Sequence, residues 1–410
     1  MLKIIRLKYL GLNDFIESFL LRKCLKVYGT NCLILNIIVW IILLEAIMNY
    51  KYKVCVYAIC KNEEQFVDRW MDHVNEADLI YVTDTGSTDN TIEKLKQKGA
   101  IVDSYITDLF RFDYSRNHCL ELIPDDVDIC VSLDLDDVIE KGWREKLENT
   151  WLPGTTRGLY IYNWSFNPDG SPAVQYTHHR IHSRHNHRWI YPTHEILEYN
   201  GSEKEQQLFI DGLTVSHFPD TEKDRSLNLP LLELAVKENP NNERNLHYLG
   251  REYMFTEQWN KSIETLLKYL DPKISFWDEE RSASMRYIAR SYGKLGNKDE
   301  QKKWLYKAIA ETPFLREPYM EFAFIAYNEQ SWELLLFLVI EALKIQDKTF
   351  KYVNEPFAWD FTPYDFAALA YYNLEMPHKA IPYSLEAMRL DPDNERLKSN
   401  HQFYIDLASK

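Results

Sequence analysis

The sequence predicts an α/β domain followed by an all-α solenoid of helical repeats. Three observations carry this prediction: apolar runs alternate with helical patterns from Lys53 onward, polar clusters follow three of these runs, and a degenerate period of about 34 residues recurs after Leu227. We therefore divide the chain into an apolar and basic segment (1–50), an α/β domain (51–226) and a region of helical repeats (227–410).

The composition fits folded domains and excludes some functions. The 410 residues are 45% hydrophobic and 14% aromatic, enough for packed cores in roughly two or three domains. The formal net charge of −14 argues against a nucleic-acid binder, because such proteins present a basic face. The six cysteines form no CxxC pair, so we expect buried free thiols, as in a cytoplasmic protein.

The first segment of the chain has a character of its own. A basic stretch precedes an apolar run from Cys32 to Leu44, which is shorter than the ~20 residues that a membrane-spanning helix needs. Three interpretations stay open: a marginal signal-anchor helix, a segment on the membrane surface, or a stretch upstream of a true start at Met48. Any membrane contact is expected through residues 27–47.

Alternating elements in the second segment predict a mostly parallel sheet with helices on both faces. We expect strands at 54–59, 79–83, 101–105 and 129–133, and helices at 64–74 and 90–98. From Leu159 to Ser183 the pattern is that of a hairpin, with a turn at Asn167–Gly170. In parallel sheets ligands bind at the carboxyl ends of the strands, where the three polar clusters fall.

These clusters carry the chemistry. Carboxylates such as those of Asp134, Asp136 and Asp137 can hold Mg²⁺ or Mn²⁺, which bridges substrate phosphates and lets a diphosphate depart as a neutralised group. Asp84 can accept hydrogen bonds from a ribose hydroxyl or a base N–H, and Gly86 permits a tight turn there. The alternatives are a solvated turn or a helix cap at Asp134–Asp137, and a capped loop without ligand at Asp84.

The combination of ICKNEE, DTGSTDNT, RFDYSRN and DLDD resembles the family 2 glycosyltransferases over about Lys53 to Asp220. The resemblance implies the GT-A fold, a nucleoside diphosphate sugar donor and single displacement with inversion. It assigns nucleotide contact to Asp84 and places Glu63 in the loop that lines the nucleotide pocket.

The resemblance also assigns the metal and diphosphate to Asp134 and Asp136. Asp137 is an additional carboxylate, so which two of the three bind metal stays open. Arg116 belongs to an element in which Ser115 replaces the usual Ala; it can pair with phosphate, orient Asp134 or form a purely structural ion pair.

A second group of candidates comes later in the α/β domain. The stretch that ends in His194 and Glu195 resembles the His-Glu element late in related transferases, with Glu195 as candidate general base and His194 as its competitor. The alternative is a pair that only shapes the acceptor pocket. Several metal-dependent transferases of this fold close the metal site with a late histidine, a role that His217 can take unless it is a buried structural residue.

A zinc cluster is the less favoured interpretation of the histidines between His178 and His194. None of them has the spacing and the cysteine partners of a structural zinc site. Trp189 and Tyr191, which precede Glu195, are candidates to stack against a sugar face.

The sequence as a whole predicts a metal-dependent, inverting glycosyltransferase that acts on an unidentified glycan or protein acceptor. The final segment fits the tetratricopeptide template in part, with an insertion at 351–360, and we expect it to recognise the acceptor, a protein partner or a second subunit. A nucleotidyltransferase is disfavoured because no Gly-rich, Lys-containing phosphate loop precedes the first helix. The alternative from another class is a non-catalytic repeat scaffold with a nucleotide-sugar-binding module.

Overall fold

The computed structural model describes residues 51–167, 169–220, 226–349 and 352–409. Residues Lys53–Lys410 cluster as one compact unit. The expectations for residues 1–50, including membrane contact through 27–47 and the start at Met48, lie outside the described residues. None of the helices in the described part of the chain is both long and apolar enough to cross a membrane.

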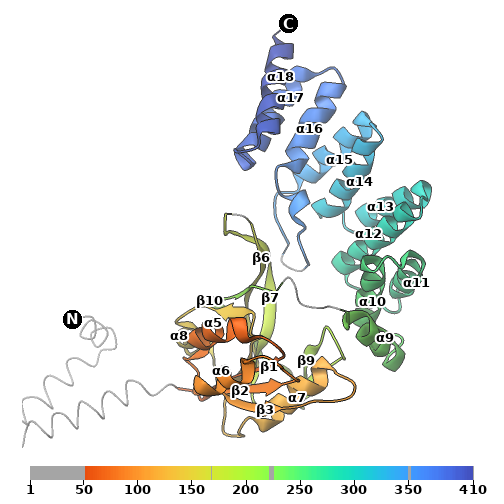
Figure 1. The fold of residues 1–410 in the computed structure, drawn as a ribbon. Coiled ribbons are helices and arrows are strands. Elements are labelled where there is room, and N and C mark those ends of the chain that lie inside the picture. Colours follow the sequence, from red (N-terminus) through yellow and green to blue (C-terminus); the bar gives the residue numbers. More distant parts are fainter. Residues whose placement is uncertain (1–50, 168, 221–225, 350–351, 410) are drawn as a thin grey trace, which may run out of the picture. The chain divides into compact units, whose positions relative to one another are not determined.

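The α/β part (Figure 1) is built on an eight-stranded sheet. Its strand order is β3-β2-β1-β4-β7-β6-β10-β5. The strands are β1 (Val54–Cys60), β2 (Leu79–Asp84), β3 (Ile101–Ser104), β4 (Ile129–Ser132), β5 (Asp137–Ile139), β6 (Arg157–Phe166), β7 (Pro172–Ser183) and β10 (Gln207–His217). A separate hairpin consists of β8 (His187–Ile190) and β9 (Ile196–Tyr199).

The sheet is mixed, which corrects the expectation of a mostly parallel one. Neighbouring strands are parallel from β3 to β4, but β7 pairs antiparallel with both β4 and β6, and β5 pairs antiparallel with β10. The hairpin expected from Leu159 to Ser183 is the β6–β7 pair, and its insertion beside β4 ends the parallel half. The carboxyl ends of β1, β2 and β4 still lie at one edge, as their parallel register requires.

Four of the described helices belong to this part: α5 (Glu64–Val74), α6 (Thr91–Gln97), α7 (Phe112–Leu122) and α8 (Trp143–Thr150). Cys55 and Tyr57 of β1 pack against Cys119 of α7 and against Trp189 of β8. Successive side chains of a strand point to opposite faces, and the alternate residue Val56 is also fully buried. Both faces of β1 are therefore covered, which fixes the strand ends that carry the polar loops.

The rest of the described chain is helical. Its helices are α9 (Asn228–Glu238), α10 (Glu243–Phe255), α11 (Trp259–Tyr269), α12 (Asp278–Lys294), α13 (Lys298–Glu311), α14 (Arg316–Asn328), α15 (Trp332–Lys344), α16 (Thr362–Asn373), α17 (Pro377–Leu390) and α18 (Glu395–Ala408). Consecutive helices pack in pairs, as in α10–α11, α12–α13, α14–α15 and α16–α17.

Small residues hold these helix pairs together. Ala308 and Ala342, one period apart, are fully buried in one core with Ala323 and Phe322. An alanine at such a position lets two backbones approach closely, and a neighbouring aromatic ring fills the remaining space. The predicted insertion falls between α15 and α16, where the described residues include a short 3₁₀ helix at Pro356–Ala358.

Candidate active site at the carboxyl edge of the sheet

The loops after β1 and β2 are tied to each other. The side-chain oxygen of Asn62 accepts a hydrogen bond from the backbone N–H of Thr88 at 2.7 Å, and the backbone N–H of Glu63 donates to the hydroxyl of Thr91 at 2.8 Å. Glu63 is buried at the start of α5. The two loops form a single wall at this edge of the sheet.

Asp84 organises its own loop. Its carboxylate accepts hydrogen bonds from the backbone N–H groups of Gly86, at 2.9 Å, and of Ser87, at 3.1 Å. Gly86 has a φ of 109°, a conformation that suits glycine best. Asp84 is only 1% exposed, so in this structure it shapes the loop rather than presenting an oxygen to solvent.

A buried ion network lies next to these loops. Arg116 of α7 donates from Nε to Glu195, at 2.7 Å, and from Nη2 to Asp134, at 2.7 Å. Arg180 of β7 donates to the other oxygen of Asp134, also at 2.7 Å, and lies 3.6 Å from Glu195. Two guanidinium groups thus balance two carboxylates, and both stack over the ring of Trp189.

This network determines the state of Asp134. Burial alone would raise its pKa, but the charges and hydrogen bonds of Arg116 and Arg180 outweigh burial and hold the pKa well below its usual range. Asp134 is therefore ionised at neutral pH, and each of its oxygens already has a cationic partner.

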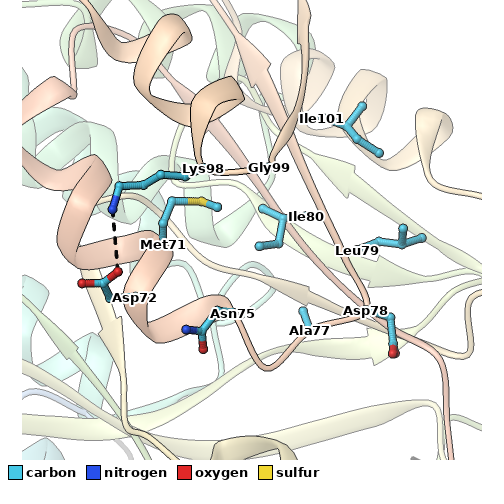
Figure 2. A pocket seen from close by; sticks show the side chains of 10 residues that line it. All are labelled: Met71, Asp72, Asn75, Ala77, Asp78, Leu79, Ile80, Lys98, Gly99 and Ile101. Carbon is cyan, nitrogen blue, oxygen red and sulfur yellow. Dashed lines mark ion pairs between the residues drawn. The ribbon is translucent and has the colours of Figure 1, made fainter.

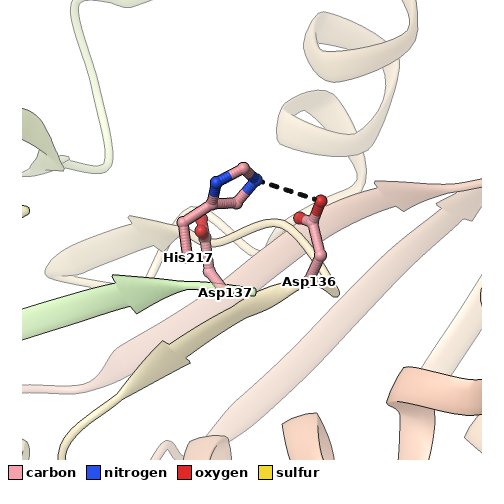
Figure 3. A group of neighbouring side chains, drawn as sticks. All are labelled: Asp136, Asp137 and His217. Atoms are coloured by element: carbon pink, nitrogen blue, oxygen red, sulfur yellow. Dashed lines mark hydrogen bonds and ion pairs between the residues drawn. The ribbon is translucent and has the colours of Figure 1, made fainter. Parts of the chain in front are cut away.

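The remaining carboxylates of this cluster adjoin His217. Strand pairing between β5 and β10 places Asp137 directly opposite His217, and Nε2 of His217 lies 3.3 Å from Oδ2 of Asp136 (Figure 3). One ligand atom from each of the three residues falls within a 4.8 Å span. Within the described residues this is the one group of histidine, cysteine or acidic side chains with such spacing. Below, "the carboxylate–histidine group" means these three residues.

The charges of this group favour a proton or a cation. Nδ1 of His217 lies 3.4 Å from the carbonyl oxygen of Trp164, and Nε2 faces Oδ2 of Asp136 at 3.3 Å, so Nε2 is the nitrogen on the side of the carboxylates. Burial lowers the pKa of His217, but the hydrogen bond to Asp136 and the charges of Asp136 and Asp137 outweigh burial and raise this pKa above its ordinary value. Burial, with the charges of Asp134 and Asp136, raises the pKa of Asp137 to about 7. Two adjacent carboxylates that resist joint ionisation are relieved by a divalent ion.

Aromatic side chains surround the carboxylate–histidine group. Trp164 of β6 stacks on His217 with ring centres 4.5 Å apart and is 45% exposed. The phenol of Tyr162 donates to Asp137 at 2.6 Å. Arg69 of α5 lies 3.4 Å from the carbonyl oxygen of Asp136. The group is therefore anchored on one side and reachable from the side of Trp164.

The structure brings together most of the residues expected from the sequence. Asp136 and His217 share the carboxylate–histidine group, whereas Asp134 lies with Arg116 in the ion network. Glu195 is buried in that network, with its side chain 6% exposed.

Two neighbours of Glu195 differ from expectation. The ring of His194 stacks on Tyr248 of α10, and burial followed by nearby arginines lowers the pKa of His194 to about 3. Trp189 is 2% exposed and its indole N–H donates to Tyr57, so it cannot stack on a sugar face as we expected. The side chain is part of the protein core.

Sequence reasoning missed Arg180 and Arg69. Arg180 sits in a histidine-rich strand, and neither its spacing nor its neighbours mark it as a partner of Asp134; only the pairing of β7 with β4 places it there. Arg69 lies in the polar half of an amphipathic helix pattern, which is the usual place for a solvated arginine.

A hollow of about 410 Å³ lies away from this site, by the starts of β2 and β3 (Figure 2). It is lined by Met71, Asp72, Asn75, Ala77, Asp78, Leu79, Ile80, Lys98, Gly99 and Ile101. Its one cation, Lys98, is paired with Asp68 at 2.9 Å and Asp72 at 3.7 Å, and the hollow is open to solvent. It does not take part in the candidate site.

Comparison with known proteins identifies the helical region. A family model described as a tetratricopeptide repeat matches residues 288–314 and 363–394, within α12–α13 and at α16–α17. The chain therefore contains tetratricopeptide repeats after the α/β part, as the sequence predicted. No curated protein matches this chain.

Among solved structures, similarity is partial. A crystal structure of MamA is 17% identical and covers 40% of this chain and 86% of its own, with a TM-score of 0.33. The structure of Pseudomonas aeruginosa pilF is 14% identical; the match covers 44% of this chain and 72% of pilF, with a TM-score of 0.33. YrrB, described as a TPR protein with an unusual peptide-binding site, is 15% identical. The match covers 41% of this chain and 78% of YrrB, with a TM-score of 0.31.

Proposed function

We propose that this protein is a metal-dependent glycosyltransferase with a GT-A type catalytic domain, which moves a sugar from a nucleoside diphosphate sugar to a glycan or protein acceptor. The observation that carries the proposal is the carboxylate–histidine group at the carboxyl edge of the sheet, where Asp136 contacts Arg69 of α5, the helix that follows β1. The pattern of motifs resembling family 2 glycosyltransferases supports the same conclusion.

The donor set of Asp136, Asp137 and His217 suits Mn²⁺ or Mg²⁺. Carboxylate oxygens are the ligands that these hard ions prefer, and an imidazole nitrogen is acceptable to Mn²⁺. A bound ion would neutralise charge on the departing diphosphate. The residues of this chain would hold the ion, while the wall formed by the Glu63 and Asp84 loops would line the nucleotide.

Asp134, Arg116 and Arg180 form the proposed floor between metal and nucleotide. The role of Glu195 has two versions. It is either the general base that accepts the acceptor proton or the residue that positions Arg116, which its 2.7 Å contact favours.

A thermal-shift panel of UDP-, GDP- and CDP-sugars, with and without Mn²⁺, tests the proposal. We expect one nucleotide class to raise Tm in the presence of Mn²⁺ and to lose this effect in Asp136→Ala. Exposed Asp393→Ala serves as the control and should behave like the unmodified chain. Equal stabilisation in EDTA, or none by any donor, would contradict the proposal.

A second function, a repeat scaffold that binds a protein partner without catalysis, is favoured by the tetratricopeptide matches. Stacked helix pairs of this kind present extended binding surfaces. If no donor binds and the chain still captures a defined partner through residues 227–410, the scaffold is the better account.

A further inference from the structure

One face of α10 carries two arginines that contact the same aromatic ring. Arg244, Tyr248 and Arg251 are spaced by four and three residues, which places them on one side of a helix. The guanidinium carbons lie 4.8 Å and 4.6 Å from the ring centre of Tyr248. His194 stacks on that ring at 4.0 Å. These four residues are called the α10 patch below.

Neither arginine has a carboxylate partner within the described ranges. Arg244 donates from Nε to the carbonyl oxygen of His194 at 3.2 Å. Nε of Arg251 is buried and has no hydrogen-bond partner among the residues that the structure places. By contrast, Arg290 in α12 pairs with Glu321 at 2.6 Å and Glu355 at 3.1 Å. A partly desolvated guanidinium without a counter-charge is costly, so the patch lacks an anion.

The acidic residues Glu252 and Glu280 interact with these two arginines at longer range. Glu280 is a nearby carboxylate, but it is engaged by the phenol of Tyr269 at 3.0 Å, and burial raises its pKa to about 7. His247 and His194 have lowered pKa values, first because of burial and then because of Arg251 and Arg244. Both imidazoles are neutral at physiological pH and add no charge of their own.

Strand β7 connects the patch with the candidate active site. Tyr176 and His178 of β7 both lie beside the ring of Tyr162, with ring centres 5.4 Å and 5.0 Å away, and Arg180 follows in the same strand across an irregularity in its pairing with β6. Arg180 contacts Asp134, and Tyr176 is within electrostatic range of both Arg244 and Asp137. A molecule held at the patch would extend along β7 toward the carboxylate–histidine group.

We propose that the α10 patch binds a phosphate group of the acceptor, so that the acceptor is a phosphate-bearing molecule; the acceptor role rests on the proposed function. One guanidinium fork satisfies the two oxygens of a carboxylate, whereas two guanidinium groups match the larger number of oxygens and the double charge of a phosphate. The phosphate supplies the counter-charge that Arg244 and Arg251 lack.

Titration of the full chain with inorganic phosphate in EDTA, followed by ³¹P NMR at constant ionic strength, tests this site. We expect saturable binding that weakens by about tenfold or more in the double variant Arg244→Gln/Arg251→Gln. Arg389→Gln removes an exposed arginine that pairs with Glu386 and should bind as the unmodified chain does. Arg251→Lys keeps the charge but loses the fork, so an intermediate loss is expected.

Absence of saturable binding, equal affinity for acetate, or unchanged affinity in a folded double variant would overturn the proposal. If the double variant does not fold, unchanged affinity in Arg251→Lys has the same meaning. EDTA removes the metal, so phosphate binding in this titration does not depend on the metal-dependent donor binding that the thermal-shift panel measures. Phosphate binding can persist when no donor binds, and donor binding can persist when phosphate does not.

Discussion

The carboxylates that follow β4 occupy two contrasting environments. Both oxygens of Asp134 contact guanidinium groups at 2.7 Å, and the pKa of this carboxyl is held well below its usual range. Asp137, three residues later, has a tyrosine hydroxyl and two acidic neighbours, and its pKa is raised to about 7. Asp134 and Asp137 belong to one short motif, yet among the described residues the charge of Asp134 is neutralised by arginines and that of Asp137 is not.

The contrast indicates which carboxylates are structural and which are available to a ligand. Asp134, a half-buried carboxylate between two arginines, is part of the protein's own charge balance, and removing either partner destabilises the fold. Carboxylates without such partners repel each other and favour a proton or a cation. The helical repeats contain the same two kinds of carboxylate. Glu355 forms ion pairs with arginines, whereas Glu280 accepts a hydrogen bond from the phenol of Tyr269.

The largest effect is expected when the balanced network is broken. Arg116→Met leaves the buried carboxylate of Glu195 and the half-buried one of Asp134 with only Arg180 between them, and we expect the free energy of unfolding to fall by about 3–5 kcal/mol. Urea unfolding followed by circular dichroism measures this change. Asp136→Asn, measured without metal, is the matched comparison and should change stability by less than about 1 kcal/mol. If both variants lost a similar free energy of unfolding, Asp134 and Asp136 would not differ in structural role as we propose.

A smaller effect is expected at Glu195. Glu195→Gln keeps an oxygen that can accept from Nε of Arg116 but removes the charge, so we expect a loss of about 1–3 kcal/mol. If Glu195 only positions Arg116, donor hydrolysis should change by less than about tenfold. A loss of about a hundredfold with little change in stability would instead make it the general base.

How far the sequence predicts the fold depends on local signals. Helix α5 matches its expected bounds because Val67, Trp70, Met71 and Val74 repeat at helical spacing. Helix α7 was not predicted, since its buried face includes Arg116 and so lacks an apolar stripe. Pairing of β5 with β10 and of β7 with β4 depends on contacts between residues far apart in the chain, which no local pattern records.

The same division applies to the site. Strand ends predicted the edge at which Asp84 and Asp136 lie, because parallel strands bring their carboxyl ends together. The ion-pair partners of each carboxylate could not be predicted from the sequence, because Arg180 contacts Asp134 only through the pairing of the inserted hairpin. The tertiary structure therefore determines which carboxylates are neutralised by arginines.

A third prediction concerns Glu280, the unbalanced carboxylate of the repeats. Burial raises its folded pKa from 4.5 to about 7, so its contribution to stability is complete below pH 4.5 and is lost as the pH rises through 7. Glu280→Gln keeps an acceptor for Tyr269 and cannot ionise. Relative to the unmodified chain, we expect this variant to gain about 1–2 kcal/mol between pH 5 and pH 8.

Urea unfolding at several pH values gives this difference. Glu386→Gln, which removes a half-buried carboxylate with a lowered pKa, is the control and should not gain stability over that range. A constant difference between Glu280→Gln and the unmodified chain from pH 5 to pH 8 would show that Glu280 is balanced after all.

The most direct test of the account is the affinity for Mn²⁺ of two neighbouring variants, measured by isothermal titration calorimetry. The account predicts that Asp136→Asn weakens Mn²⁺ binding by about a hundredfold, because it removes a ligand, whereas folded Asp134→Asn stays within about threefold. Retained affinity in Asp136→Asn together with a large loss in Asp134→Asn would place the ion at the arginine network and contradict the account.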